Sequence, residues 1–398
     1  MTTSTIDTGG PTTVTLNKRK RALMIMSIVF IIIAILWLLY WLIWGRFEVY
    51  TDDAYVNGNL VQLMSQVPGT VISINADDTY YVKEGQIIIK LDPTDMLLAL
   101  DHASSSLALT VRQVNQLFEK AEQAQALLAM NRADLVKAQL DLHRRKGLVG
   151  DRAISREELQ HYQTNVDNAQ AQYDTALHKM RAARALVANS HLYTHPTVEL
   201  AKEKFKNAYL NNVRTTILAP ATGYVAKRNI QIGQQVATNT LMLAIVPLRD
   251  IWVDANYKES QLSHLRVGQP VTLRADAYAD VVYHGKVVGL NAGTGAAFAL
   301  LPAQNATGNW IKIVQRLPVR ISLDPEEIKA HPLQIGLSMR VTVDTHHREG
   351  ERLSTVASDK PIYTTDVYAN QLANVDAMID KILHDNSPDL FLPEKIDD

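Results

Sequence analysis

Cysteine is absent from this chain of 398 residues. Its absence excludes disulfide bonds, thiolate metal sites and a cysteine nucleophile. The chain also lacks an excess of charge, because the formal net charge is −1 and charged residues make up 20% of the sequence. A nucleic-acid-binding protein normally carries a basic patch or stripe, so the composition argues against a nucleic-acid partner. The length allows two or three domains.

The residue patterns of metal, nucleotide and catalytic sites are missing as well. The histidines are scattered, and the adjacent His346 and His347 have no third ligand at a usable spacing, so we expect no metal site. The Gly-Thr-Gly turn at 293–295 lacks the Gly-Lys-Ser/Thr of a P-loop. Asp52 and Asp53 are adjacent, so on a strand they would face opposite sides and could not pair as acid and base. We predict no catalytic residue, no cofactor and no metal ion.

One long apolar run is present, at residues 22–44, and it contains no charged side chain. At 1.5 Å per residue it spans about 34 Å, enough for the hydrocarbon core of a membrane, which is about 30 Å thick. A signal peptide would have a shorter apolar core and a small-residue cleavage site. Instead, Trp37, Trp41 and Trp44 stand near the end of the run, as at a membrane interface. We predict a retained transmembrane helix over 22–44, with these tryptophans at the interface.

The orientation of the predicted anchor follows from the four basic residues at 18–21, directly before the apolar run. The positive-inside rule places the tail, residues 1–21, in the cytoplasm. No second apolar run of spanning length occurs in the sequence. We therefore expect a single-pass protein whose body lies on the far side of the membrane.

Two β-rich segments resemble each other across a long gap. The first has Gly69 and Gly85 and the second has Gly223 and Gly233, each pair set among runs rich in Val and Ile. Val and Ile favour strands, and glycine supplies turns. We predict one lipoyl-like β-sandwich cut in two, with its first half and an initial strand in 45–93 and its second half in 214–248.

The segment between the halves, 94–213, has a seven-residue hydrophobic period, which is the seam of a coiled coil. The repeat falls at Leu100, Leu107, Val114, Ala121, Leu128, Leu135 and Leu142, and again at Leu159, Val166, Tyr173, Met180 and Val187. Gly147 and Gly150 end the first helix, and Ser155 with Glu158 forms the capping-box pattern that begins the second. The sequence predicts an antiparallel helical hairpin with its tip at about 146–155.

Pro196 interrupts the returning arm of this hairpin, so we expect a break near His195 and a helix that resumes at about Val198. A plain structural coiled coil would show the same heptads. We favour a docking role because the first arm, from Thr94 to about Lys146, would reach about 80 Å. A projection of that length from a small β domain is expected to meet a partner.

The remainder of the chain consists of a β-rich segment and an acidic tail. Short β-rich runs bounded by turn residues in 249–345 predict a small β-barrel. The tail, residues 346–398, is acidic, with ten acidic and four basic side chains in 351–398. It contains one weakly amphipathic helix candidate, at about 370–384. We expect this tail to be peripheral and partly disordered.

Three strings carry a family resemblance: 51–59 (Thr-Asp-Asp-Ala-Tyr-Val-Asn-Gly-Asn), 253–262, which begins Val-Asp-Ala-Asn-Tyr-Lys-Glu, and 293–320, which contains Leu-Leu-Pro-Ala-Gln-Asn-Ala-Thr-Gly-Asn-Trp. With the anchor, the split sandwich, the hairpin and the barrel, the sequence resembles the drug-efflux branch of the haemolysin D family of membrane fusion proteins, and in particular EmrA-type adaptors. The resemblance covers roughly residues 20–345. The implied fold is a mixed α and β, multidomain one.

The resemblance implies a periplasmic adaptor without enzymatic activity, anchored in the bacterial inner membrane. Such an adaptor joins a proton-driven major-facilitator drug transporter to a TolC-type outer-membrane channel for the export of hydrophobic drugs or toxins, as a ring of three or six copies. Related adaptors dock the channel through Arg, Leu and Ser at the tip, which correspond to Arg144, Leu148 and Ser155. Ser155 would also serve as a helix cap, and Arg144 could simply solvate a helix end.

Three alternatives remain. A type I secretion adaptor, which works with an ABC transporter on a protein substrate, shares the architecture, but the specific strings match the drug-efflux branch. An enzyme or acyl carrier is disfavoured because Lys90 lies in a strand-like run and not at an exposed turn. A structural envelope spacer would have no transport role.

Overall fold

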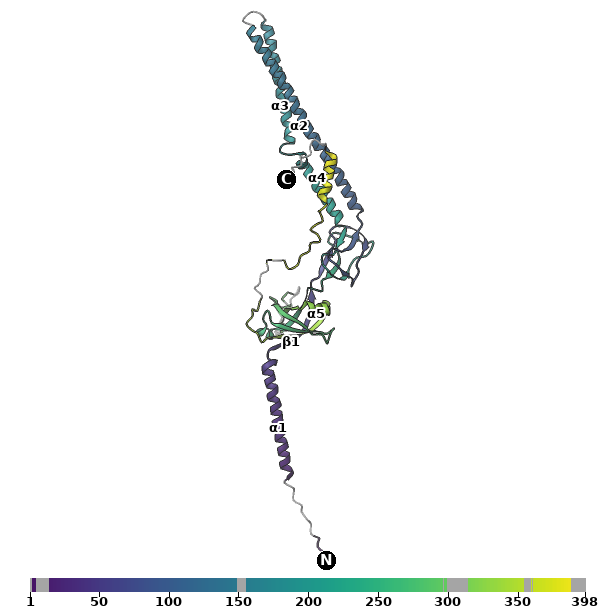
Figure 1. Ribbon diagram of the computed structural model, residues 1–398, viewed down its shortest axis with the longest axis vertical. Coiled ribbons are helices and arrows are strands. Elements are labelled where there is room, and N and C mark those ends of the chain that lie inside the picture. Colours follow the sequence, from purple (N-terminus) through teal and green to yellow (C-terminus); the bar gives the residue numbers. More distant parts are fainter. Residues whose placement is uncertain are drawn as a thin grey trace, which may run out of the picture. The chain divides into compact units, whose positions relative to one another are not determined.

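The computed structural model describes residues 2–4, 14–148, 155–295, 297–298, 314–353, 359 and 361–387, without the side chains of 14–18, Trp44 and Leu148. The chain divides into two compact units (Figure 1). The first unit combines Met1–Val61 with Val246–Tyr363, and the second combines Gln62–Ile245 with Thr364–Asp398. Each unit is described by itself.

The first unit begins with helix α1 (Val14–Tyr40), followed by a π-helical turn, η1 (Trp41–Gly45). Within the described part of the chain, one helix is long and apolar enough to cross a membrane, at Arg19–Ile43, with a mean hydropathy of 3.0. Trp37 and Trp41 expose 66% and 47% of their surface, whereas the side chain of Trp44 lies outside the described residues. An apolar helix exposed on all sides fits a single-pass membrane anchor.

The rest of this unit is a closed antiparallel barrel with the strand order β1-β10-β13-β12-β11-β14. Its strands are β1 (Glu48–Gly58), β10 (Ile251–Lys258), β11 (Pro270–Ala275), β12 (Tyr283–Leu290), β13 (Arg316–Leu323) and β14 (Ser338–Asp344). A 3-10 turn, η3 (Glu259–His264), and a short helix, α5 (Pro325–Ala330), join them. Inward residues alternate with outward ones, as along β10, and fill the interior.

The assignment of the initial strand to the lipoyl-like half 45–93 is wrong, because β1 belongs to the barrel. Ala54 pairs with Ala255 of β10, and Val49 pairs with Val343 of β14. The register shifts between Thr51 and Ala54, which bends the strand. Without β1, strands β10 and β14 would be open edges with unpaired backbone groups. The predicted barrel, 249–345, therefore lacked one of its strands.

Among the described residues, the Tyr257 hydroxyl is a buried polar group of the barrel interior without a hydrogen-bond partner. Tyr257 is fully buried, and its hydroxyl makes no hydrogen bond within the described part of the chain. Burial raises the pKa of this hydroxyl far above its ordinary value. A buried donor that lacks a partner loses its hydration without compensation, so the hydroxyl destabilises the barrel.

We expect Tyr257→Phe to stabilise the barrel by about 1 kcal/mol, because it removes the uncompensated hydroxyl and keeps the ring. Above the ordinary tyrosine pKa of 10.0, the unfolded chain loses this proton while the folded chain keeps it, so wild-type stability falls as the pH rises. The stability of the variant should not show this fall at alkaline pH, because phenylalanine has no hydroxyl to ionise. Hydrogen exchange of β10 and β13 in the full chain measures both effects, and faster exchange in the variant at neutral pH would contradict the prediction.

The second unit contains a β-sandwich of two four-stranded sheets, in the orders β2-β9-β7-β4 and β6-β5-β3-β8. The strands are β2 (Val61–Met64), β3 (Gly69–Ile74), β4 (Tyr81–Val82), β5 (Ile87–Leu91), β6 (Thr216–Leu218), β7 (Gly223–Arg228), β8 (Gln235–Val236) and β9 (Leu241–Val246). Both sheets mix strands from before and after the helical segment, as the split-sandwich prediction requires. Gly85 and Gly233 form its turns with φ values of 78° and 81°, which glycine adopts without strain.

Helices fill the gap between the two halves of the sandwich: α2 (Thr94–Leu148), α3 (Arg156–Leu186), a 3-10 turn η2 (Leu192–Thr194) and α4 (Pro196–Val213). Helix α2 has 55 residues, which is roughly 83 Å at 1.5 Å per residue. Seam residues of α2 are buried, including Leu107, Val114, Leu135 and Leu142. The predicted heptad hairpin is thereby confirmed, and so is the break before Pro196.

The tail is not peripheral throughout, contrary to the expectation for 346–398. Residues Val375–Asn386 form helix α6, drawn in yellow beside α2 and α4 in Figure 1. Val375, Ile379 and Leu383 are buried in one cluster with side chains of α2 and α4. These three residues stand four positions apart, so they lie on one narrow face of a helix.

Candidate partner-docking hairpin

The two helices of the hairpin contribute side chains of different size to the seam of the coiled coil. Helix α2 contributes large residues such as Leu135 and Leu142, and α3 contributes small or half-buried ones such as Ala176, which is 3% exposed. Small residues let two helices approach closely, but they leave less apolar area to bury. The stretch near the tip therefore consists of two helices with most of their surface in solvent.

The predicted tip lies between the end of α2 at Leu148 and the start of α3 at Arg156, and residues 149–154 are outside the described part of the chain. The last turn of α2 is basic, with Arg145 and Lys146, which complements the negative end of the helix dipole. Arg145 lies over the ring of Tyr162, with its guanidinium carbon 5.3 Å from the centroid, and so connects the two arms.

The structure gives two of the three predicted docking residues partners within their own arms. Arg144 is an exposed side chain that forms an ion pair with Asp141, three residues before it on α2. The Ser155 hydroxyl accepts a hydrogen bond from the backbone N–H of Glu158 at 3.0 Å, which makes it the N-cap of α3. Leu148 is the last residue of α2, and its side chain lies outside the described residues.

We expect Ser155→Ala to destabilise the start of α3 by about 1 kcal/mol, because the Glu158 N–H loses its acceptor. Ser155→Asn should restore the cap, since an asparagine side chain also accepts at this position. Hydrogen exchange of residues 156–160 measures the difference. Equal protection in all three proteins would show that the cap contributes nothing.

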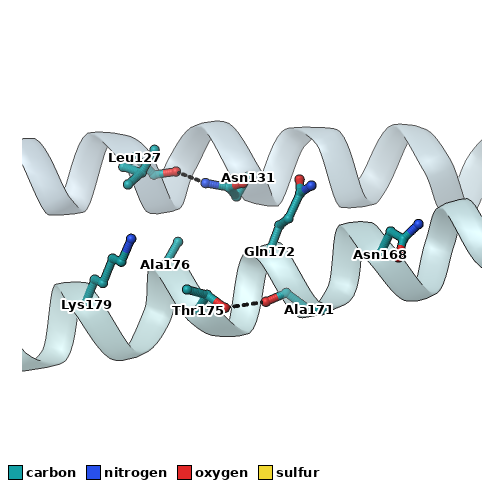
Figure 2. A pocket seen from close by; sticks show the side chains of 8 residues that line it. All are labelled: Leu127, Asn131, Asn168, Ala171, Gln172, Thr175, Ala176 and Lys179. Carbon is teal, nitrogen blue, oxygen red and sulfur yellow. Dashed lines mark hydrogen bonds between the residues drawn. The ribbon is translucent and has the colours of Figure 1, made fainter.

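The middle of the hairpin carries a groove of about 520 Å³ between α2 and α3, shown in Figure 2. Leu127, Asn131, Asn168, Ala171, Gln172, Thr175, Ala176 and Lys179 line it. Figure 2 shows the Gln172 and Lys179 side chains reaching toward the opposite helix. A second groove, of about 530 Å³, includes Leu128, Arg132, Val136 and Tyr173 among its lining.

Short side chains line both grooves: Ala171 and Ala176 of α3 in the first, and Ala129 and Ala133 of α2 in the second. Their walls mix amides, charges and short apolar side chains. Such open grooves suit side chains of another helix better than an enclosed small molecule, which normally binds in a largely apolar cavity. Within the described residues, no group of three or more His, Cys, Asp or Glu could hold a metal ion.

The break in the returning arm is built by His195, which is 8% exposed. Its Nδ1 accepts a hydrogen bond from the Thr197 backbone N–H at 3.3 Å and thereby caps α4. Its Nε2 lies 3.1 Å from the carbonyl oxygen of Leu186, the last residue of α3. Because Nδ1 accepts, Nε2 carries the proton and donates to Leu186. The imidazole therefore joins the two helices across the break.

Two family models match the chain. The EMRA alpha-helical hairpin domain matches residues 94–215, and the CusB-like beta-barrel domain matches residues 250–347. The first match covers the hairpin with its break, and the second covers the barrel strands after β1.

Curated relatives match over most of the chain. The sequence is 46% identical over 350 residues to the multidrug export protein EmrA of Escherichia coli K12, covering 88% of this chain and 90% of the relative. It is 44% identical over 373 residues to the fatty acid resistance protein FarA of Neisseria gonorrhoeae, covering 93% and 94%. Among solved structures, the periplasmic adaptor protein EmrA matches with 22% identity and a TM-score of 0.38, covering 75% of this chain and 99% of that one.

Proposed function

Because this chain belongs to the EmrA-type membrane fusion proteins, we propose that it is the periplasmic adaptor of a tripartite multidrug efflux pump. The observation that carries the proposal is the 46% identity, over 88% of the chain, to a multidrug export protein. The 55-residue helix α2 agrees with this role, because an adaptor must span a distance between membranes. The protein acts as a scaffold and performs no catalysis.

The proposed adaptor sits in the bacterial inner membrane through α1. The basic residues at 18–21 keep the short N-terminal tail in the cytoplasm, and the body lies in the periplasm. Chain continuity supports a barrel close to the membrane surface, since only Arg46 and Phe47 separate Gly45 at the end of η1 from Glu48 of β1.

The proposed partners are a proton-driven major-facilitator drug transporter in the inner membrane and a TolC-type channel in the outer membrane. The tip docks the channel through Arg144, Leu148 and Ser155, and the exported compounds are hydrophobic drugs or toxins. Arg144 is exposed and held by an ion pair on its own helix, so its position is partly preorganised. Docking adds a second role to Ser155, beside its role as the helix cap.

Several copies form the conduit, as a closed ring of three or six. The two mid-hairpin grooves support this arrangement, because a neighbouring hairpin can insert side chains where short side chains line the grooves. A heterologous contact of this kind closes into a ring when the rotation between copies is a whole fraction of a turn.

The test is the drug sensitivity of a deletion strain with and without the wild-type gene. Restored resistance to hydrophobic toxins supports the efflux role, whereas an unchanged phenotype in a strain without other pumps contradicts it. The identity of the co-purifying transporter separates the alternatives. A multi-span permease agrees with drug efflux, whereas an ABC transporter together with a lost protein secretion phenotype would indicate a type I secretion adaptor.

A further inference from the structure

The segment 364–387, called here the C-terminal strap, contacts both the β-sandwich and the helices of the second unit. Near its start, the Thr365 hydroxyl donates a hydrogen bond to the Glu84 carboxylate at 3.0 Å. Tyr368 then borders a small cavity of about 20 Å³ beside Arg214, the residue that follows α4. The first part of the strap therefore lies on the sandwich and on the joint where the returning arm meets it.

The second part of the strap is α6, whose apolar stripe is buried against the lower hairpin. Val375, Ile379 and Leu383 expose only 1%, 3% and 5% of their surface. Their cluster includes Leu107 and Val111 of α2, and Val198 and Phe205 of α4. The base of the hairpin is thus a bundle of three helices, whereas the part nearer the tip has two.

Polar contacts at both ends of α6 set its direction. At the start, the Asp376 carboxylate lies 3.4 Å from the Lys206 ammonium of α4. At the end, Asn386 Oδ1 accepts hydrogen bonds from Arg112 of α2, at 3.0 Å from Nε and 2.7 Å from Nη2. Because α4 runs from Pro196 to Val213, α6 is antiparallel to α4 and parallel to α2.

The strap also reaches the break in the returning arm. The Ser387 hydroxyl, just after α6, lies 2.9 Å from the hydroxyl of Tyr193, which belongs to η2. A helix interrupted in this way loses consecutive backbone hydrogen bonds, and such points are where arms bend. A third helix packed alongside α4, with its end on η2, opposes that bending. The start of the strap, where Thr365 contacts Glu84 and Tyr368 lies beside Arg214, opposes bending where the hairpin joins the sandwich.

We propose that the C-terminal strap is a positioning element that fixes the direction in which the hairpin leaves the sandwich, and so determines where the tip is presented. The strap acts through the packing of Ile379 and Leu383 against α2 and α4. It also acts through its hydrogen bonds to Glu84 and Tyr193. Its importance for export rests on the proposed adaptor function, whereas its mechanical role does not.

The absence of native cysteine allows a direct measurement on the full-length protein. Spin labels on cysteines that replace the exposed Gln160 of α3 and Lys227 of β7 report the hairpin direction relative to the sandwich. The probe variant is Ile379→Asp, which puts a charge into the buried stripe. The matched control is Met378→Asp, one residue earlier on the same helix and 40% exposed. Ile379→Leu keeps an apolar side chain at this position and tests whether an apolar residue there is sufficient for wild-type behaviour.

We expect Ile379→Asp to broaden the distance distribution about twofold, because the joint then bends freely. Met378→Asp and Ile379→Leu should keep the wild-type width. Hydrogen exchange in 196–205 should rise at least about tenfold in Ile379→Asp, with the sandwich strands unchanged. If exchange rises but the distribution stays narrow, the strap stabilises the bundle without positioning the hairpin, and the proposal is overturned. The proposal is also overturned if hydrogen exchange in 196–205 of Ile379→Asp stays at the wild-type rate.

Drug resistance separates this proposal from the adaptor function. With the protein at wild-type level, Ile379→Asp should lose most of the resistance that Met378→Asp retains. Full resistance in Ile379→Asp, alongside a sensitive deletion strain, would leave the adaptor function standing and overturn the positioning role. A deletion strain without a phenotype would contradict the adaptor function, and the distance distribution would still decide the mechanical role.

Discussion

A single charge at the hairpin tip, Leu148→Asp, is expected to abolish drug resistance while the protein accumulates at its normal level. Leu148 is the last residue of α2, so we expect the substitution to leave the helical pairing that precedes it intact. Inside a docking contact, however, the carboxylate would have to lose its hydration without a partner. The loss of a central apolar contact typically costs at least about 2 kcal/mol, which is roughly a 30-fold loss of affinity.

The matched control for this experiment is Leu140→Asp on the same helix, whose leucine is 55% exposed. It adds the same charge below the tip and should retain resistance. Complementation of the deletion strain and co-purification with the outer-membrane channel measure the effect. Equal resistance in wild type and Leu148→Asp would contradict the proposal that Leu148 at the tip docks the channel. Equal loss in both variants would show that the whole arm, and not the tip, is sensitive to charge.

The barrel should be most sensitive at Gly285, where we expect Gly285→Ala to cost about 3 kcal/mol. A β-carbon there would overlap the backbone carbonyl oxygen of Ser322, and it would also press on Ile321 and Leu273. The carbonyl cannot move aside cheaply, because Gly285 faces Leu323 in the β12–β13 ladder and Lys286 faces Ser322. The strand pair must separate or the barrel must distort.

Gly289→Ala provides the comparison on the same strand. A β-carbon at Gly289 meets nothing within 4 Å, so its effect should stay within about 0.5 kcal/mol. Hydrogen exchange of β12 and β13 in the full chain measures both variants. A Gly285→Ala protein as well protected as wild type would show that the barrel accommodates the methyl group by a small shift.

The helical hairpin could be predicted from sequence because its information is local and periodic. Leu107, Val114, Leu135 and Leu142 repeat every seven residues, and all are buried in the structure. The break at Pro196 and the cap at Ser155 are also local signals, since each concerns backbone groups within four residues. The roles of Arg144 and Leu148 in docking rest on resemblance, and they remain predictions.

The position of β1 was not predictable from its own residues. An alternating strand such as Glu48–Gly58 fits the edge of any sheet, and sequence order favoured the neighbouring sandwich. Only the closure of the barrel decides the matter, because β10 and β14 both need a partner for their backbone groups. That requirement appears when strands nearly 200 residues apart, such as β1 and β10, come together.

By itself, the sequence determined the anchor, the hairpin with its break, the split sandwich and the family. Each of them depends on an apolar run, a hydrophobic period or a local sequence motif. The tertiary structure alone decided where β1 pairs and what α6 covers. The stripe of Val375, Ile379 and Leu383 is too short to identify its partner, and the acidic residues around it suggested a solvated tail. Burial against α2 and α4 outweighs that composition, because apolar area removed from water stabilises wherever in the chain it comes from.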